Sequence, residues 1–212
     1  MTVGVIDYGA GNLGSVMRAL EALRAAPVLL TRTADLDHTD RLVLPGVGNF
    51  ADCMQRLRDG GWIEPLRQVV LGAHRPLLGI CVGMQMLADE SSEGSNDASG
   101  VSGLGFIPGR VEHLRALGCN QRVPHVGWNA VAPADVCDPL FEGIPQDTDF
   151  YFVHSFAFRP AVAESVLATA DYGVPVTAAV RHGQVWGTQF HPEKSSRAGF
   201  RVLQNFLAAT PC

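Results

Sequence analysis

The sequence is short of charged residues and has no long apolar run. Charged residues make up 17% of the 212 residues, below the roughly 25% usual in soluble domains, while hydrophobic residues make up 47%. No apolar stretch approaches the roughly 18 residues that a membrane-spanning helix needs. This composition argues against a disordered chain and suits a well-buried α/β interior. The length, with no linker composition to divide it, favours one domain over residues 1–212.

Basic residues are also scarce. There are 16 Lys and Arg against 21 Asp and Glu, which gives a net charge of -5, and no run of Lys or Arg makes a local exception. A mildly acidic chain of this kind lacks the electrostatic signature of a nucleic-acid-binding protein. Residues 1–7 contain no basic leader ahead of an apolar stretch, so we expect neither a secretory signal nor a transit peptide.

Cysteines are few, odd in number and widely spaced, and none lies in a Cys-x-x-Cys pair. This spacing makes a disulfide framework or a structural zinc site improbable. We therefore expect reduced thiols, a cytoplasmic protein, and neither a metal nor a cofactor. The five positions are Cys53, Cys81, Cys119, Cys137 and Cys212.

The first hundred residues alternate continuous apolar runs with segments of helical period. This alternation predicts a parallel sheet covered by helices on both faces. The expected strands are residues 3–7, 28–33, 41–44 and 76–80, and the expected helices cover about 16–24, 50–57, 62–71 and 82–87. Residues 89–100 are polar and rich in Gly and Ser, which indicates an exposed loop.

Beyond residue 100 the pattern changes to short strands separated by turn residues. The strand candidates are residues 111–114, 129–131, 150–153, 165–169, 176–180 and 184–190. A final helix is expected at about 196–207, with Phe200, Leu203, Phe206 and Leu207 on its buried face. The predicted fold is α/β: a central, mostly parallel twisted sheet flanked by helices, with antiparallel strands in the C-terminal half.

Cys81 lies in a Gly-x-Cys-x-Gly segment, Gly79 to Gly83, between a buried strand and the start of a helix. The serine form of this arrangement is the nucleophile elbow, a sharp turn that lifts one side chain clear of the sheet. The position at a helix N-terminus favours a thiolate, and the N–H of Val82 would face a developing oxyanion. A buried structural cysteine is the alternative interpretation.

His191 and Glu193 follow the apolar run that ends at Phe190. Residues two apart in an extended chain point to the same side, so the two side chains can face one pocket. A histidine can take the proton of a thiol, and a carboxylate behind it fixes the tautomer. Taken alone, the pair could equally be surface residues at a strand end; with the cysteine turn it indicates nucleophilic catalysis.

Both segments together resemble the class I (triad) glutamine amidotransferase family, with Cys81, His191 and Glu193 as the catalytic triad. Six segments in order resemble one branch of that family, the glutaminase subunits of a two-subunit synthase of histidine biosynthesis. They are IDYGAGNL at 6–13, LPGVG at 44–48, GICVGMQ at 79–85, PHVGWN at 124–129, YFVHS at 151–155 and QFHPEKS at 189–195. Val82 stands where leucine is commoner in this branch, and Phe156 where tyrosine is commoner.

The resemblance implies roles for further residues. The oxyanion would be bound by N–H groups of Val82 and of the segment Gly46, Val47 and Gly48. Glutamine would contact Gly48, Gln85, His154 and Ser155. The face toward a partner would include Asn12, Pro124, His125, Gly127, Trp128, Asn129 and Lys194.

The resemblance also implies a partner, a cyclase subunit built as a (β/α)8 barrel, in a heterodimer. The chain would hydrolyse glutamine to glutamate and pass ammonia to that subunit.

Three alternatives to this function stay open. One is the glutaminase subunit of another synthase, such as pyridoxal phosphate synthase. The second is a dinucleotide-binding oxidoreductase, because Gly9, Gly11 and Gly14 fit Gly-x-Gly-x-x-Gly and Asp35 lies near the expected acidic position. The third is a binding module that has kept the fold without activity.

Overall fold

The computed structural model describes residues 1–95, 100–134 and 138–209. Part of the segment expected to be an exposed loop, residues 96–99, lies outside these ranges, as do Cys137 and Cys212. Within them, no helix is both long and apolar enough to cross a membrane.

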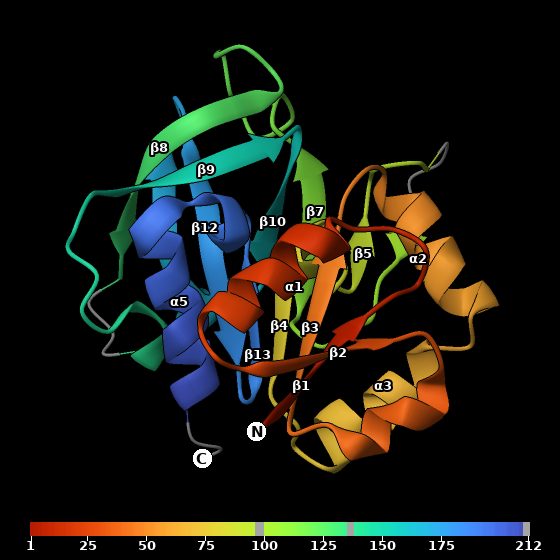
Figure 1. Ribbon diagram of the computed structural model, residues 1–212. Coiled ribbons are helices and arrows are strands. Elements are labelled where there is room, and N and C mark those ends of the chain that lie inside the picture. Colours follow the sequence, from red (N-terminus) through yellow and green to blue (C-terminus); the bar gives the residue numbers. More distant parts are fainter. Residues whose placement is uncertain (96–99, 135–137, 210–212) are drawn as a thin grey trace.

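The N-terminal half forms the parallel part of a nine-stranded sheet (Figure 1). The strand β1 (Thr2–Ile6) lies between β2 (Ala26–Leu30) and β3 (Arg41–Gly46), and β3 pairs in turn with β4 (Leu77–Cys81), all in parallel. Every residue of β3 and β4 is buried. This explains their continuous apolar sequences, since strands covered on both faces have no solvent side to alternate with. The predicted parallel sheet is confirmed.

The C-terminal half extends the same sheet with antiparallel strands, as predicted. The strand β13 (Val185–Thr188) pairs parallel with β4 and antiparallel with β12 (Pro175–His182). Beyond β12 come β11 (Val166–Asp171), β8 (His125–Pro133) and β9 (Thr148–His154). The strand order is β2-β1-β3-β4-β13-β12-β11-β8-β9. Segments from the two halves of the chain therefore meet at β4 and β13.

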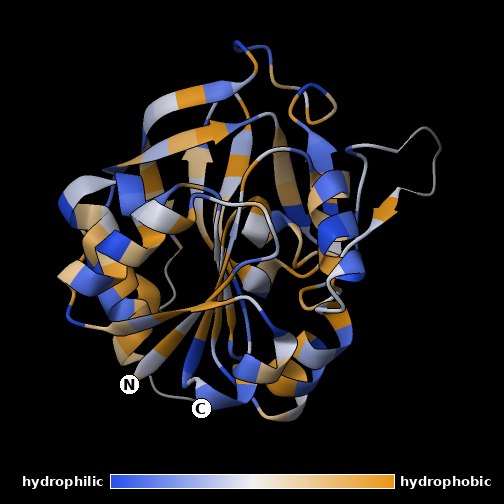
Figure 2. Ribbon diagram, turned by 45° about the vertical axis from the view of Figure 1, so that its right-hand side comes forward, coloured by the Kyte–Doolittle hydropathy of each residue, from blue (hydrophilic) through white to orange (hydrophobic). Residues whose placement is uncertain are grey.

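Helices cover both faces of this sheet. Figures 1 and 2 show α1 and α5 on one face and α2 and α3 on the other, with their hydrophobic sides toward the strands. The α-helices are α1 (Leu13–Ala22), α2 (Phe50–Asp59), α3 (Ile63–Arg67), which continues into the π-helical turn η2 (Gln68–Gly72), α4 (Val82–Gln85) and α5 (Ser196–Ala208). The 3-10 helices are η1 (Thr33–His38), η3 (Pro139–Phe141), η4 (Ala163–Ser165) and η5 (Pro192–Lys194).

A second, four-stranded sheet packs beside the first and was not predicted. Its order is β10 (Phe156–Pro160), β7 (Gly109–His113), β5 (Glu90–Ser91) and β6 (Val101–Ser102). The strand β5 lies inside the segment expected to be an exposed loop, and its Ser91 is fully buried. That expectation is therefore wrong for these residues, because pairing with β7 and β6 buries a stretch whose polar composition predicts a loop.

Several predicted boundaries shift, among them those of α1, β2, β8 and β13, and tertiary contacts explain two further shifts. The strand β3 continues through Pro45 to Gly46, because pairing with β1 ends at Val43 and the missing N–H of proline therefore costs no hydrogen bond on that side. The helix α4 ends at Gln85 rather than at residue 87. The carbonyl oxygen of Leu87 instead accepts two hydrogen bonds from N–H groups at residues 106 and 107, at 2.8 and 3.0 Å.

The final helix buries a stripe slightly different from the predicted one. Leu203 and Phe206 are fully buried as expected, whereas Phe200 and Leu207 are half-buried at the margin. Val202 is also fully buried, and Asn205 donates from Nδ2 to the carbonyl oxygens of residues 140 and 142, at 3.0 and 2.8 Å. Because η3 packs against one side of α5, the buried stripe is centred between these positions.

Candidate active site

Three adjacent parallel strands end at the same edge of the sheet. Gly46 at the end of β3 stands directly opposite Cys81 at the end of β4. The next strand along, β13, ends at Thr188 and leads within three residues to His191. Because the carboxyl ends of parallel strands lie on one side, a cysteine and a histidine 110 positions apart in the sequence arrive together.

Cys81 occupies a strained backbone conformation at a sharp turn. Its φ is 56° and its ψ is -113°, a region that side-chain-bearing residues rarely adopt and that costs about 1–3 kcal/mol. Gly83 makes the turn possible, since a Cβ there would lie 1.9 Å from the carbonyl oxygen of Leu44 in β3. The thiol donates to the carbonyl oxygen of Val153 at 3.9 Å. Strand, tight turn and one helical turn therefore form the elbow that the glycine spacing predicts.

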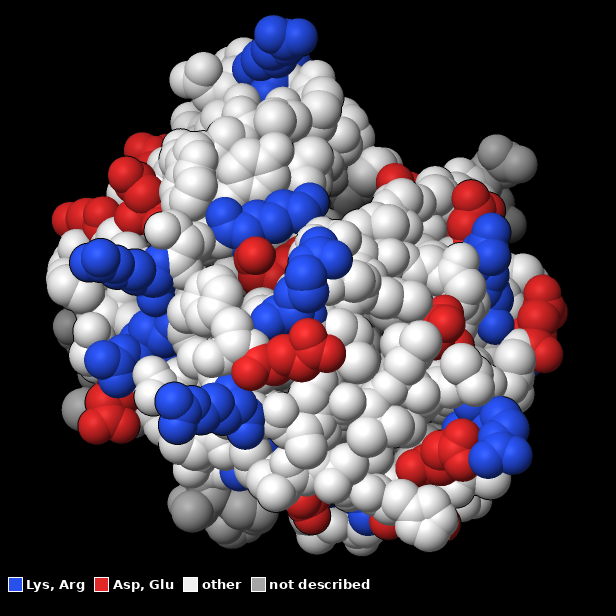
Figure 3. Space-filling view, viewed as in Figure 1, with Lys and Arg blue, Asp and Glu red and all other residues white. Residues whose placement is uncertain are grey.

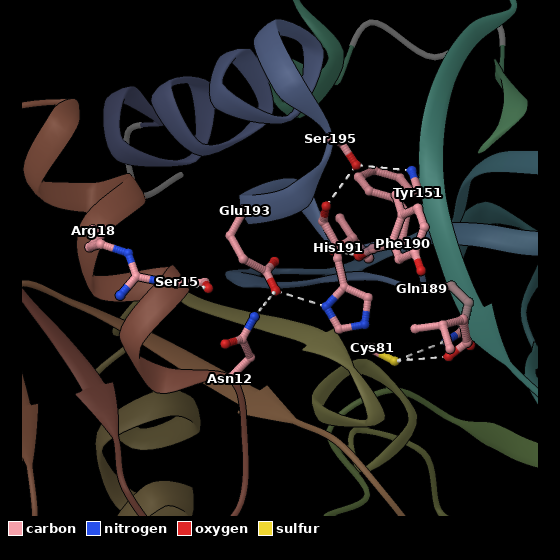
Figure 4. Close-up of polar contacts among 12 residues, drawn as sticks. Asn12, Ser15, Arg18, Cys81, Tyr151, Gln189, Phe190, His191, Glu193 and Ser195 are labelled. Carbon is pink, nitrogen blue, oxygen red and sulfur yellow. Dashed lines mark hydrogen bonds and ion pairs between the residues drawn. The ribbon is translucent and has the colours of Figure 1, made fainter. Parts of the chain in front are cut away.

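Figure 4 shows the imidazole of His191, which follows β13, lying between the sulfur of Cys81 and the carboxylate of Glu193. Nδ1 of His191 donates to Oε1 of Glu193 at 2.8 Å, and the two side chains are only 2% and 1% exposed. The bond leaves Nε2 directed toward Cys81, buried and without another hydrogen-bond partner. The carboxylate thus holds the imidazole in the orientation that can exchange a proton with the sulfur.

The electrostatic surroundings favour a protonated His191. Burial lowers the pKa of this imidazole, but the hydrogen bonds and negative charges of Cys81 and Glu193 outweigh it and raise the pKa to about 9. A positively charged imidazole next to the sulfur stabilises the thiolate form of the cysteine. The arrangement therefore keeps a proton on the imidazole that faces the sulfur.

The backbone of His191 is held in place by β9 and by a serine that the sequence analysis did not single out. Its N–H donates to the carbonyl oxygen of Tyr151 at 3.0 Å. The buried Oγ of Ser195 donates to the carbonyl oxygen of His191 at 2.6 Å and accepts from the N–H of Tyr151 at 3.0 Å. Ser195 thereby links the strand that covers the site to the loop that carries the imidazole.

Asn12 comes from the glycine-rich turn before α1 and lies next to Glu193. Its Nδ2 donates to Oε1 of Glu193 at 3.4 Å, the same oxygen that accepts from His191 (Figure 4). The resemblance implied only a place near a partner for this residue. The structure places it in contact with the carboxylate as well, so the glycine turn contributes to the site.

The thiol opens on a cavity of about 160 Å³. All four residues expected to contact glutamine, namely Gly48, Gln85, His154 and Ser155, line it, together with Val47, Cys81, Val82, Glu93, Val153, Phe156 and His191. Gly46 is buried in β3 and is not among the residues that line the cavity. The volume is below the roughly 300–1,000 Å³ of pockets that hold drug-sized ligands, so the cavity suits a small metabolite.

Among the residues that the structure describes, Glu93 is the one carboxylate that lines the cavity, and its place there was not predicted. Its Oε2 accepts from the N–H of Phe50 at the start of α2, at 2.8 Å. Burial raises the pKa of this carboxyl, although the backbone hydrogen bond opposes the shift. A single Glu within a polar, Gly- and Ser-rich segment carries no signal in sequence, and only the path of the chain brings it to the cavity.

The side chain of His154 belongs to a buried chain of hydrogen bonds. Its Nδ1 donates to the carbonyl oxygen of Phe156 at 2.8 Å, so its Nε2 accepts from Nδ1 of His125 at 2.9 Å. The ring of His125 in turn accepts from Nδ2 of Asn129, at 3.3 Å. Burial lowers the pKa of His154 to about 3 and that of His125 to about 4, so both rings are neutral.

The phenyl ring of Phe156 packs edge-on against His113. A tyrosine, which is commoner at this position in the branch that the sequence resembles, would add a hydroxyl there.

The residues expected on a partner face divide between surface and interior. Trp128 is 54% exposed on β8, and Pro124 and Lys194 are also exposed, whereas Gly127 and Asn129 are half-buried. His125 is only 2% exposed, so its side chain lies beneath this face rather than on it. In Figure 3 the surface over β8 and β9 is largely uncharged, while acidic and basic residues are interspersed elsewhere.

Over residues 1–95, 100–134 and 138–209, no group of three or more His, Cys, Asp or Glu side chains is arranged to hold a metal ion.

Comparison with models of protein families matches residues 4–210 to glutamine amidotransferase class-I. This chain belongs to the class I glutamine amidotransferase family. The amidotransferase is 47% identical over 219 residues to imidazole glycerol phosphate synthase subunit HisH of Methylococcus capsulatus, with 99% of this chain and 97% of the relative covered. It is 45% identical over 218 residues to the protein of the same name from Rhodospirillum rubrum, with 100% of each chain covered.

Solved structures share the fold of this amidotransferase. One described as a glutamine amidotransferase superposes with a TM-score of 0.73 and 23% identity, over 97% of this chain and 96% of the other. The structure of PurLQS from Thermotoga maritima gives a TM-score of 0.72 and 16% identity, over 97% of both chains. At these identities the likeness shows the fold alone, and it confirms the predicted α/β class.

Proposed function

We propose that this chain, acting as one domain over residues 1–212, is the glutaminase subunit of imidazole glycerol phosphate synthase. It hydrolyses glutamine to glutamate and ammonia and passes the ammonia to a cyclase subunit, which makes imidazole glycerol phosphate and aminoimidazole carboxamide ribotide in histidine biosynthesis. The observation that carries the proposal is the strained Cys81 beside His191, whose other nitrogen is held by Glu193 at 2.8 Å. Full-length relatives at 45–47% identity, named as this subunit, support the choice of synthase.

The first half of the reaction breaks the amide bond of glutamine. The thiolate of Cys81 attacks the carboxamide carbon, and the carbonyl oxygen takes the negative charge. His191, already protonated, gives its proton to the departing nitrogen, so that ammonia leaves and a thioester remains on Cys81. A raised pKa suits this role, because the imidazole holds a proton ready at neutral pH.

The oxyanion needs hydrogen-bond donors on the side of the cavity opposite His191. We assign one to the N–H of Val82, which directly follows the nucleophile. The second comes from the segment 46–48, of which Val47 and Gly48 border the cavity. Removing one such donor typically raises a barrier by about 3 kcal/mol. If the second donor forms only when the cyclase is bound, the isolated chain will be nearly silent.

The second half of the reaction returns the enzyme to its starting state. His191, now neutral, takes a proton from water, and the resulting hydroxide attacks the thioester carbon. The bond to sulfur breaks, the electron pair returns to the thiolate of Cys81, and the new carboxyl group releases its remaining proton to solvent as glutamate leaves. Glu193 stabilises the imidazolium each time it forms, and Asn12 donates to the same carboxylate oxygen, Oε1, at 3.4 Å.

The cavity carries groups that suit the two ends of free glutamine. Gly48, Gln85, His154 and Ser155 offer polar groups, and Glu93 offers the negative charge that the substrate ammonium requires. The small volume of about 160 Å³ fits an amino acid far better than a dinucleotide. For this reason we do not favour the oxidoreductase alternative.

The partner surface follows from the exposed apolar residues next to the site. Val126 and Trp128 on β8 are each 54% exposed, and Val153 on β9 is 37% exposed. Lys194 lies over the ring of Tyr151, with Nζ 5.8 Å from the ring centroid. An apolar patch rimmed by charge is typical of a protein interface. We propose that a (β/α)8-barrel cyclase binds here to give a heterodimer, because ammonia released into bulk water would be protonated and unreactive.

The test uses Cys81→Ala in the complex with the cyclase subunit. Synthesis fed with glutamine should vanish, while synthesis fed with ammonium salts should continue at the wild-type rate. The matched control is Cys119→Ala, which removes another buried thiol in a separate cluster beneath β10. Retained glutamine-fed synthesis in Cys81→Ala would refute the assignment.

A second measurement tests the choice of partner. The glutaminase rate of the wild-type chain is measured alone, with the cyclase, and with the cyclase and its ligand. We expect the rate to rise at each step. Co-purification with a different synthase, and no response to the cyclase, would support the alternative glutaminase, and no turnover in any mixture would support the inactive binding module.

A further inference from the structure

A pair of buried glutamine side chains lies beneath the nucleophile: Gln85, which also lines the cavity, and Gln189, which has no part in the mechanism so far. Gln189, between β13 and His191, is fully buried, and Gln85 in α4 is 2% exposed. Nε2 of Gln85 donates to Oε1 of Gln189 at 2.9 Å. Nε2 of Gln189 donates to Sγ of Cys81 at 3.8 Å (Figure 4). The pair therefore connects the floor of the cavity to the reacting sulfur.

The orientation of both amides follows from a single backbone carbonyl. The oxygen of Phe156 can only accept, and the amide of Gln85 lies 2.9 Å from it, so the NH2 group of Gln85 must face it. The same NH2 group also meets the amide of Gln189, which must therefore present its oxygen. That leaves the NH2 group of Gln189 directed at the sulfur of Cys81. The amide cannot rotate by 180° without placing two donors or two acceptors against each other.

We propose that Gln189 is a positioning residue for Cys81. Its N–H group holds the sulfur toward the cavity and stabilises the thiolate, while Gln85 and the carbonyl of Phe156 lock its direction. The inference deepens the proposed function, since it rests on Cys81 being the nucleophile.

The sulfur lies between a donor and an acceptor, and this arrangement distinguishes its two protonation states. The neutral thiol can donate to the carbonyl oxygen of Val153 at 3.9 Å. The thiolate has no proton to donate, and that carbonyl then repels it weakly. The N–H of Gln189 favours the thiolate, because a hydrogen bond to an ionised acceptor is stronger than one to a neutral acceptor. A buried amide also carries a desolvation cost that an apolar side chain of the same length would avoid, so the donor is not needed for packing.

The test measures the alkylation rate of Cys81 by iodoacetamide as a function of pH. Mass spectrometry of the peptide containing Cys81 separates its reaction from that of the other cysteines. In Gln189→Met, which keeps the length but has no donor, the pH midpoint of alkylation should rise by about one unit, which corresponds to a tenfold loss of thiolate below the midpoint. Above both midpoints the rates of variant and wild type should converge.

Two further variants keep the result interpretable. Gln189→Glu keeps the shape and the acceptor for Gln85 but places oxygen against sulfur, so its midpoint should rise at least as far. Gln184→Met, at the residue just before β13, removes another buried amide and should leave the midpoint unchanged. If Gln189→Met does not fold, as judged by circular dichroism, Gln189→Glu decides the matter alone.

The outcomes separate this inference from the proposed function. A midpoint within about 0.2 units of wild type in a folded Gln189 variant would overturn the inference, since that corresponds to about a 1.6-fold change in thiolate against the tenfold change expected. Equal slowing at every pH would mean a loss of access rather than of thiolate, and would also overturn it. A shifted midpoint in a chain that never hydrolyses glutamine would uphold the role of Gln189 and refute the glutaminase.

Discussion

Replacing Gly83 by alanine tests whether close contact between β3 and the turn after Cys81 holds the site together. A Cβ at Gly83 would lie 1.9 Å from the carbonyl oxygen of Leu44 and 3.0 Å from its carbonyl carbon. Both are main-chain atoms of a fully buried central strand, so no side chain can rotate away to relieve the contact. Adding a methyl group to a well-packed core typically costs about 1–3 kcal/mol, and this contact is at the severe end. We expect Gly83→Ala to lower the free energy of unfolding by at least about 3 kcal/mol.

The assay is urea unfolding followed by circular dichroism, with Gly72→Ala as the control. Gly72 ends the π-helical turn η2, and a Cβ there would meet nothing within 4 Å. Alanine at such a site restricts the unfolded chain and should raise stability by up to about 1 kcal/mol. Any Gly83→Ala protein that folds should also lose most of its glutaminase activity, because the elbow would be displaced from β3. A change in unfolding free energy below about 1 kcal/mol for Gly83→Ala would refute the reasoning.

Three other predictions follow from the site and its surroundings. The free energy of unfolding should fall as the pH is lowered from about 6.5 toward 4. Burial lowers the pKa of His125 to about 4 and of His154 to about 3, so the unfolded chain binds protons at a higher pH than the folded chain does. Urea titrations across this range measure the dependence of stability on pH, and the same dependence in His154→Gln would contradict the prediction. Ser195→Ala should cost about 1–3 kcal/mol of stability and slow glutamine hydrolysis, since it leaves a buried N–H of β9 unpaired, whereas Ser196→Ala at the exposed neighbour should change neither. Trp128→Ala should weaken binding of the cyclase subunit by about 2 kcal/mol or more in calorimetry while stability stays within about 0.5 kcal/mol; unchanged affinity would remove this face from the interface.

The prediction of the fold succeeded where a segment carries its own signal. Strands β3 and β4 have continuous apolar sequences because both faces are covered, and helix α5 shows a helical period. Strand β5 failed because its burial depends on pairing with β7, which lies about twenty residues away, and a polar composition contains no trace of that pairing.

The site was predicted to the extent that its chemistry is local. Gly79, Cys81 and Gly83 lie within five residues, and their spacing alone predicts an elbow. His191 and Glu193 are two positions apart, so their shared direction follows from extended backbone geometry. Glu93 and Gln189 could not be found in this way, since each acquires a role only from neighbours distant in the chain.

The sequence by itself determined the turn that exposes the thiol, the alternation of strands and helices, and the presence of a nucleophile, a base and a carboxylate. Only the tertiary structure decided that β4 and β13 lie side by side, which brings together residues 110 positions apart. It also decided the pKa values of the three buried imidazoles: the pKa of His191 is raised, and those of His125 and His154 are lowered. The physical reason is that the order of strands and helices along the chain and the geometry of a turn depend on residues adjacent in the sequence. Desolvation and Coulomb energies depend instead on every group within a few ångströms in space.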